Sequence, residues 1–140
     1  MRGFAIVFLG LAGIILAAAA RADDLTGADR FLCSAGPASA CCDDGQCASG
    51  TAAELNIPQF IEVDVANKRL STTKASGLNR TSPIDNLKRV NGQVVMQGVE
   101  NERAYSIVIS DSTGEMSAAV AASGCNVTVF GACTPLPASK

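Results

Sequence analysis

Short runs of β-branched residues recur along the chain from residue 59 onward, and a turn signal separates each run from the next. A spacing of about 8 to 12 residues between turns is typical of an all-β sandwich or barrel. Within the runs, apolar and polar residues alternate, so that Tyr105, Ile107 and Ile109, for example, share one face. The sequence therefore predicts an antiparallel meander with strands at 59–65, 69–73, 84–90, 93–97, 103–110, 115–121 and 125–132.

The edges of this meander determine its overall shape. A twisted sheet of about seven strands tends to close or to fold onto itself, because closure removes the unpaired edges. We expect a small closed barrel, with a β-sandwich as the alternative. The segment around Phe31 and Cys33 would add an eighth strand beside the last one, and Gly36 and Pro37 would keep that strand short.

The first 22 residues have the order of a cleavable signal peptide. A positive end at Met1-Arg2 precedes an uncharged apolar stretch, and the small residues Ala20 and Ala22 precede the acidic Asp23. We expect cleavage between Ala22 and Asp23, and an uncleaved membrane anchor is the alternative. The chain then divides into a signal peptide at 1–22, a Cys-rich irregular segment at 23–58, a β-meander domain at 59–134 and a flexible tail at 135–140.

Export would also change the charge of the chain. The full sequence has a net charge of −2, and removal of residues 1–22, which contain two arginines and no acid, leaves −4. We expect no nucleic-acid partner, because the exported domain is acidic, and a mature form that is not embedded in a membrane. The periplasm is the expected location, with secretion as the alternative. The partner stays unknown, and an envelope or extracellular protein is one class to consider.

Six cysteines lie beyond the signal segment, and an even number in an exported chain predicts three disulfides. Cys42 and Cys47 flank an Asp-Gly turn that brings them close, so we expect them to pair. Cys33 and Cys133 lie near the two ends of the domain. Their bond would close the largest loop, which stabilises by about 4 to 5 kcal/mol in the chain-entropy model.

The remaining pairing would join Cys41 to Cys125. Six cysteines allow many connectivities, so all three pairings are hypotheses. Metal binding through Cys41, Cys42 and Cys47 is the alternative. It is disfavoured because the chain has no His and none of the paired CxxC spacings of zinc sites.

The absence of His also excludes the Ser/His and Cys/His arrangements of nucleophilic catalysis. Glu62 and Asp64 are a candidate pair of carboxylates, but alternation places them on the solvent face of the strand at 59–65. No glycine-rich stretch resembles a phosphate loop. We therefore expect no enzyme activity, no catalytic residue, no metal and no cofactor.

Five segments resemble a family of small, uncharacterised exported proteins of Gram-negative bacteria: FLCS at 31–34, NIPQFIEVD at 56–64, ASGLNR at 75–80, QGVE at 97–100 and FGACTP at 130–135. The resemblance covers most of the chain beyond residue 22, implies a periplasmic location and supplies no activity. The outline is also similar to the periplasmic C-type lysozyme inhibitors, small barrels that block a lysozyme cleft with an exposed loop. The Ser-Gly loop of that family corresponds to Ser76-Gly77 or Ser123-Gly124 here.

Two classes of function remain after these exclusions, with an enzyme a distant third. The first is a binding or inhibitory module that acts through its loops, and the second is a structural, envelope-associated domain without a ligand. The longest polar connection is the candidate binding loop, with Lys74, Ser76, Gly77, Asn79 and Arg80 as candidate contacts. A cavity lined by Tyr105, Phe60 and Met96 would favour small-molecule binding, whereas a filled interior would favour a protein-contact or structural role.

Overall fold

The computed structural model describes residues 23–137, and this part of the chain is all-β, as the alternating pattern predicts. The predicted signal peptide at 1–22, and with it Ala22 of the predicted cleavage site, lies outside the described residues. The described residues form ten strands rather than seven or eight, and one 3-10 turn, η1, at Lys74–Ser76. The strands are β1 (Arg30–Cys42), β2 (Cys47–Thr51), β3 (Phe60–Asp64), β4 (Arg69–Thr72), β5 (Thr81–Pro83), β6 (Asn86–Val90), β7 (Gln93–Glu100), β8 (Arg103–Ser110), β9 (Glu115–Ala122) and β10 (Cys125–Pro135).

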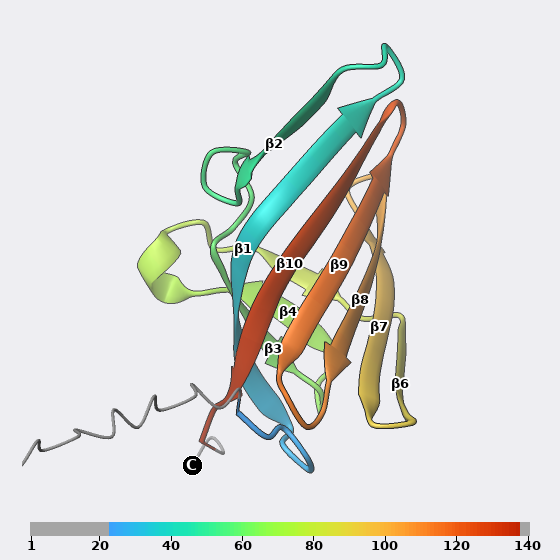
Figure 1. Ribbon diagram of the computed structural model, residues 1–140. Coiled ribbons are helices and arrows are strands. Elements are labelled where there is room, and N and C mark those ends of the chain that lie inside the picture. The colour runs from blue at the N-terminus through green and yellow to red at the C-terminus, as the bar shows by residue number, and fades with distance from the viewer. Residues whose placement is uncertain (1–22, 138–140) are drawn as a thin grey trace, which may run out of the picture.

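The strands form one antiparallel sheet in the order β5-β4-β3-β1-β10-β9-β8-β7-β6, and β2 pairs with the second half of β1. From β6 to β10 the strands are consecutive hairpins, as predicted. β1 comes first in the chain but lies between β3 and β10, so it joins the two halves of the sheet. Figure 1 shows β1 and β10 side by side along their length.

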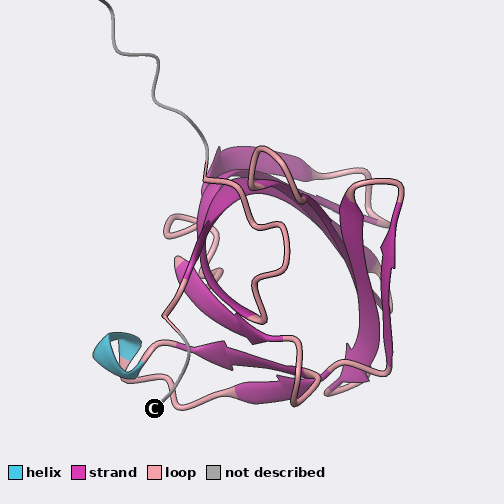
Figure 2. Cartoon of the chain, turned by 90° about the horizontal axis from the view of Figure 1, so that it is seen from below, coloured by secondary structure: helices cyan, strands magenta, loops and turns pink. Residues whose placement is uncertain are grey.

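The sheet is strongly curled, and its two outermost strands come close together (Figure 2). β5 and β6 are consecutive in the chain, and Ile84 and Asp85 connect them. The Asp85 N–H donates to Gln97 O at 2.9 Å, and the Val99 N–H donates to the Asp85 carboxylate at 3.0 Å. No backbone ladder joins β5 to β6 or β7 within residues 23–137, so the sheet is a curled half-barrel and the predicted closed barrel is not confirmed.

β1 is much longer than the short strand expected around Phe31, and it continues through Gly36 and Pro37. A bulge between Ala35 and Ala38 shifts its register against β10. A one-residue shift exchanges the two faces of a strand, and proline is tolerated at bulges. Phe31 therefore faces the core before the bulge, and Ala38 does so after it.

The segment at 41–58, expected to be irregular, contains the end of β1 and all of β2. β2 extends the sheet as a hairpin whose last rung is Cys41 opposite Cys47. The pattern also misses β5, which lies in the connection between the predicted strands at 69–73 and 84–90. At the predicted start of the tail, Pro135 instead ends β10, and the Leu136 N–H donates to Arg30 O at 2.8 Å.

Three disulfides join residues that lie directly opposite each other on neighbouring strands: Cys33–Cys133, Cys41–Cys47 and Cys42–Cys125. The first is the pairing that the sequence predicts. The predicted Cys42–Cys47 and Cys41–Cys125 bonds are wrong, because Cys42 continues β1 instead of opening a loop. Successive residues of a strand point to opposite faces, so Cys41 reaches β2 on the exposed face while Cys42 reaches β10 on the inner face.

These disulfides fit an oxidising environment outside the cytoplasm, where such bonds persist. Between residues 23 and 137, no helix is long and apolar enough to cross a bilayer.

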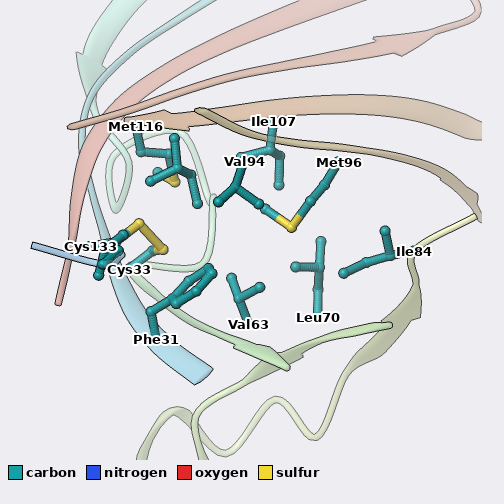
Figure 3. Packing of buried hydrophobic residues seen from close by; sticks show 12 residues of the cluster. Phe31, Cys33, Val63, Leu70, Ile84, Val94, Met96, Ile107, Met116 and Cys133 are labelled. Atoms are coloured by element: carbon teal, nitrogen blue, oxygen red, sulfur yellow. A yellow bond between two sulfur atoms is a disulfide. The ribbon is translucent and has the colours of Figure 1, made fainter. Parts of the chain in front are cut away.

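The hydrophobic core lies between facing walls of the curled sheet, at the end where β1 begins (Figure 3). One wall comes from β1, β3 and β4, and the other from β7, β8 and β9. The largest fully buried side chains are those of Phe31, Leu25, Met96, Ile109, Val63 and Val94. The Cys33–Cys133 bond lies beside Phe31 in the same cluster.

Residues 23–29 belong to no strand and cross this end of the sheet (Figure 2). The Leu25 N–H donates to Asp111 O at 2.7 Å, and the Leu25 side chain is fully buried. Arg89 donates to Ala28 O and also pairs with the Asp111 carboxylate at 2.6 Å. The segment that directly follows the predicted cleavage site is therefore part of the folded domain.

Candidate functional site

A cavity of about 230 Å³ lies between the inner faces of the sheet, toward the end opposite residues 23–29. It exists because the inward side chains on β9 and β10 are small at this end. Ala118 and Val120 of β9 and Val127 and Val129 of β10 line it, where larger side chains would fill the space. The core is thus complete at one end of the half-barrel and hollow at the other.

The wall of the cavity is mainly apolar. Besides the small residues of β9 and β10, it contains side chains from three further strands and the segment before β3: Ile57, Pro58, Ile61, Leu70 and Ile107. Leu70, Ile107 and Met116 lie between the cavity and the core, since they belong to both. An apolar wall of this kind favours an apolar group over water.

Polar side chains lie on the same inner faces, nearer the mouth. Arg80, Ser82, Glu100 and Arg103 all line the cavity. Ser82 Oγ donates to the Glu100 carboxylate, and Arg80 Nη2 lies 3.8 Å from Glu100 Oε2. Arg103 begins β8 and, by alternation, is on the same face as Tyr105 and Ile107. The site therefore combines an apolar interior with a charged rim.

Tyr105 stands between these two regions. Its hydroxyl donates to Pro83 O, which ties β8 to β5 across the gap in the sheet. Burial raises the pKa of Tyr105 to about 12, and the negative charges of Asp85 and Glu100 add to this effect. The phenol therefore stays neutral over the physiological range of pH.

Gly98 provides the space for this tyrosine. It lies directly opposite Tyr105 in the β7–β8 ladder. A Cβ at Gly98 would lie 2.5 Å from Tyr105 Oη and 2.7 Å from Pro83 O, which is too close for either contact. Only a residue without a side chain allows the phenol to cross the neighbouring strand at this rung.

The predicted binding loop is only partly at this site. Of its five candidate residues, Arg80 lines the cavity, while Lys74, Ser76, Gly77 and Asn79 do not. Those four lie around η1, which projects from the sheet (Figure 1). The base of the loop is closed where the Arg80 N–H donates to Thr72 Oγ1 at 3.0 Å and the Thr72 N–H donates to Arg80 O at 3.0 Å.

The expected cavity lining is also only partly present. Tyr105 contributes, but Phe60 is 41% exposed on the outer face and Met96 is fully buried in the core. Sequence reasoning missed Ser82, Glu100 and Arg103. Arg103 could have been predicted, because the Tyr105-Ile107-Ile109 alternation, extended by two positions toward the N-terminus, places Arg103 on the same face. Ser82 and Glu100 are brought together by the curling of the sheet, which no local pattern encodes.

A second hollow, of about 560 Å³, lies on the outer face over β7 to β10. Its lining includes exposed residues such as Gln97, Ala104, Ala119 and Thr128, so it is a surface depression and not an interior site. We therefore take the interior cavity as the candidate site.

The described residues contain no cluster of three or more His, Cys, Asp or Glu that could hold a metal ion. No known protein-family model matches the chain, and no curated protein matches its sequence.

Proposed function

We propose that this domain binds a small molecule with an apolar body in the interior cavity of the half-barrel. The observation that carries the proposal is the combination of a complete core at one end and an apolar cavity of about 230 Å³ at the other. An unfilled apolar cavity costs stability, because the atoms that line it lose packing contacts. A ligand would restore those contacts.

The volume sets the size of the ligand. An apolar cavity of about 150 Å³ holds one benzene molecule, so this cavity has room for about nine non-hydrogen atoms. Because the mouth is open at the rim, a somewhat longer molecule could extend outward. The expected ligand is therefore small compared with a typical drug or cofactor.

The test uses the fluorescence of Tyr105, which lines the cavity, to detect binding. The chain has one tyrosine and no tryptophan, so its intrinsic fluorescence reports on the cavity. We expect octan-1-ol to change this fluorescence in a saturable manner. Ala118→Leu, which places a larger side chain in the cavity, should abolish saturation, while the matched Ser117→Leu on the exposed face of the same strand should leave it unchanged. Equal responses from the two variants would contradict the proposal.

A second candidate is binding or inhibition of a protein through the projecting loop at 73–80. The observation that favours it is Leu78, which is 50% exposed in this loop, as is fitting for a contact residue, and the same loop contains the exposed Lys74. A lysozyme inhibition assay tests the inhibitory version, with Leu78→Ser as the matched variant. Inhibition that Leu78→Ser removes would favour this candidate, and no inhibition by the wild type would reject its inhibitory version.

We further propose that the mature chain works in the periplasm, with secretion as the alternative. The support is the apolar N-terminal segment of the sequence and the three disulfides. Fractionation of cells followed by N-terminal sequencing tests both location and cleavage. An N-terminus at Asp23 in the periplasmic fraction is the expected result.

A further inference from the structure

We infer that the ligand of the cavity is an amphipathic carboxylate, with its apolar tail inside the cavity and its anionic head at Arg103. This inference rests on the proposed function, because it concerns the same cavity. It adds the chemical class of the head group, which an apolar wall alone does not determine.

The first support is a gradient of polarity along the inner faces of the strands. On β8 the inward residues run from the fully buried Ile109 through Ile107 and Tyr105 to the exposed Arg103. On β7 the inward row likewise runs from buried Val94 toward Glu100 at the rim. A ligand that matches both ends of this gradient has an apolar tail and a polar head.

The second support is the distribution of charge at the rim. Two arginines, Arg80 and Arg103, face one carboxylate, Glu100. Glu100 accepts from Ser82 and lies 3.8 Å from Arg80, so its charge is already engaged. Arg103 makes no ion pair with any residue in 23–137. A single anionic group would complete the rim.

A cationic head group is disfavoured, because the described residues at the rim offer it no free negative charge. Arg103 would repel it, and Tyr105 offers no negative charge because its phenol is neutral and its proton is donated to Pro83 O. Asp85 lies near Tyr105, but its carboxylate accepts from the Val99 N–H. An arginine guanidinium also binds a carboxylate through two parallel hydrogen bonds, which gives this pairing its geometric selectivity.

The experiment compares three probes that share one eight-carbon tail: octanoate, octan-1-ol and octylamine. Tyr105 fluorescence gives an affinity for each. We expect octanoate to bind about three- to tenfold more tightly than octan-1-ol, which is the usual worth of a partly exposed charged hydrogen bond, and octylamine to bind most weakly. Added salt should weaken the binding of octanoate and leave that of octan-1-ol unchanged.

Arg103→Gln assigns the preference to one residue. It should remove the advantage of octanoate over octan-1-ol, and Arg103→Lys should keep part of it. Lys88→Gln is the matched control, because it removes the same charge from an exposed position on the outer face of β6. That control should bind octanoate like the wild type.

The outcomes separate this inference from the proposed function. If octan-1-ol binds as tightly as octanoate, and Arg103→Gln changes neither affinity, the carboxylate inference is overturned and the cavity remains a binding site. If octylamine binds most tightly, the inference is likewise overturned. If none of the three probes gives a saturable change in the wild type, the proposed function itself fails.

Discussion

At the scale of single residues, the paired positions Gly98 and Tyr105 connect the cavity wall to the open edge of the sheet. Tyr105 crosses the β7–β8 ladder over Gly98 and donates its proton to Pro83 O on β5. The same side chain therefore fastens the open edge of the half-barrel and forms part of the cavity wall. An aromatic side chain placed over a strand glycine is a known device for stabilising such positions in sheets.

Gly98→Ala tests this rung. The new Cβ would clash with both the phenol and the backbone carbonyl of Pro83, and the backbone atom could shift only at a cost in stability. We expect a loss of about 1 to 3 kcal/mol in the free energy of unfolding, measured by urea denaturation. Val99→Ala is the control, because Val99 is 57% exposed on the same strand, and it should change stability by less than about 0.5 kcal/mol. Similar losses for the two variants would show that the rung is not tightly packed.

Titration of Tyr105 gives a prediction about pH. The pKa of the folded phenol is about 12, above its ordinary value of 10.0, chiefly because of burial. Below pH 10 the phenol is neutral in both states, so its contribution to stability is fully present. Between pH 10 and pH 12 the unfolded chain ionises first, and stability falls as the pH rises toward the folded pKa.

The measurement is the ultraviolet absorbance of the phenolate, which comes from a single residue because the chain has one tyrosine. We expect a midpoint near pH 12 for the folded protein and near pH 10 for the protein unfolded in urea. Coincident midpoints would mean that Tyr105 is solvated in the folded state.

At the scale of strands and turns, local patterns predict the second half of the sheet well. Asn91-Gly92, a dipeptide typical of tight hairpins, forms the two-residue turn between β6 and β7 with φ of 50° and 73°, and Gly114 has the left-handed conformation that glycine readily adopts in turns. These elements depend on neighbours in sequence, so the sequence encodes them locally. The strand bounds from β6 to β10 accordingly agree with the predicted ranges to within a few residues.

The first half of the sheet is harder to predict, because its strands are stabilised by pairing with strands that are distant in sequence. β1 has Gly36 and Pro37 in its middle, which argue against a strand when read locally. Pairing with β2, β3 and β10 overrides that local preference. The error in the cysteine pairing has the same origin, since the partner of Cys42 depends on which face of β1 it occupies. The charged rim of the cavity likewise could not be predicted from local sequence, because Ser82 and Glu100 come into contact only when the sheet curls.

The disulfides should contribute unequally. Cys33–Cys133 spans 100 residues and lies in the core, whereas Cys41–Cys47 spans 6 residues on an exposed hairpin. In the chain-entropy model the first stabilises by about 4 to 5 kcal/mol and the second by about 2 kcal/mol. Replacing each pair with alanine and measuring urea denaturation should show the larger loss for Cys33→Ala with Cys133→Ala. A larger loss for the hairpin pair would contradict this order.

At the scale of the whole molecule, the half-barrel has one closed end and one open end. Residues 23–29 and the apolar cluster close the first, and the cavity with its charged rim occupies the second. The arrangement separates a packed end of the sheet from a hollow one. The packed end holds Leu25, Phe31 and the Cys33–Cys133 bond, whereas small side chains surround the cavity at the open end.

This separation predicts that Leu25 is essential for stability although it belongs to no strand. Its side chain is fully buried in the core cluster, and its N–H donates to Asp111 O. Leu25→Ala should lower the free energy of unfolding by about 2 to 5 kcal/mol, the usual cost of a cavity at a buried leucine. The control is Leu78→Ala, which removes the same atoms from a side chain that is 50% exposed and should cost less than about 0.5 kcal/mol.

The comparison of these two leucines also tests whether the segment after the predicted cleavage site is part of the fold. Both variants are measured by urea denaturation in a chain that begins at Asp23. A large loss for Leu25→Ala alone means that residues 23–29 form the closed end of the half-barrel and are more than a linker from the predicted signal peptide. Equal, small effects would mean that this segment contributes little and that β1 alone begins the stable domain.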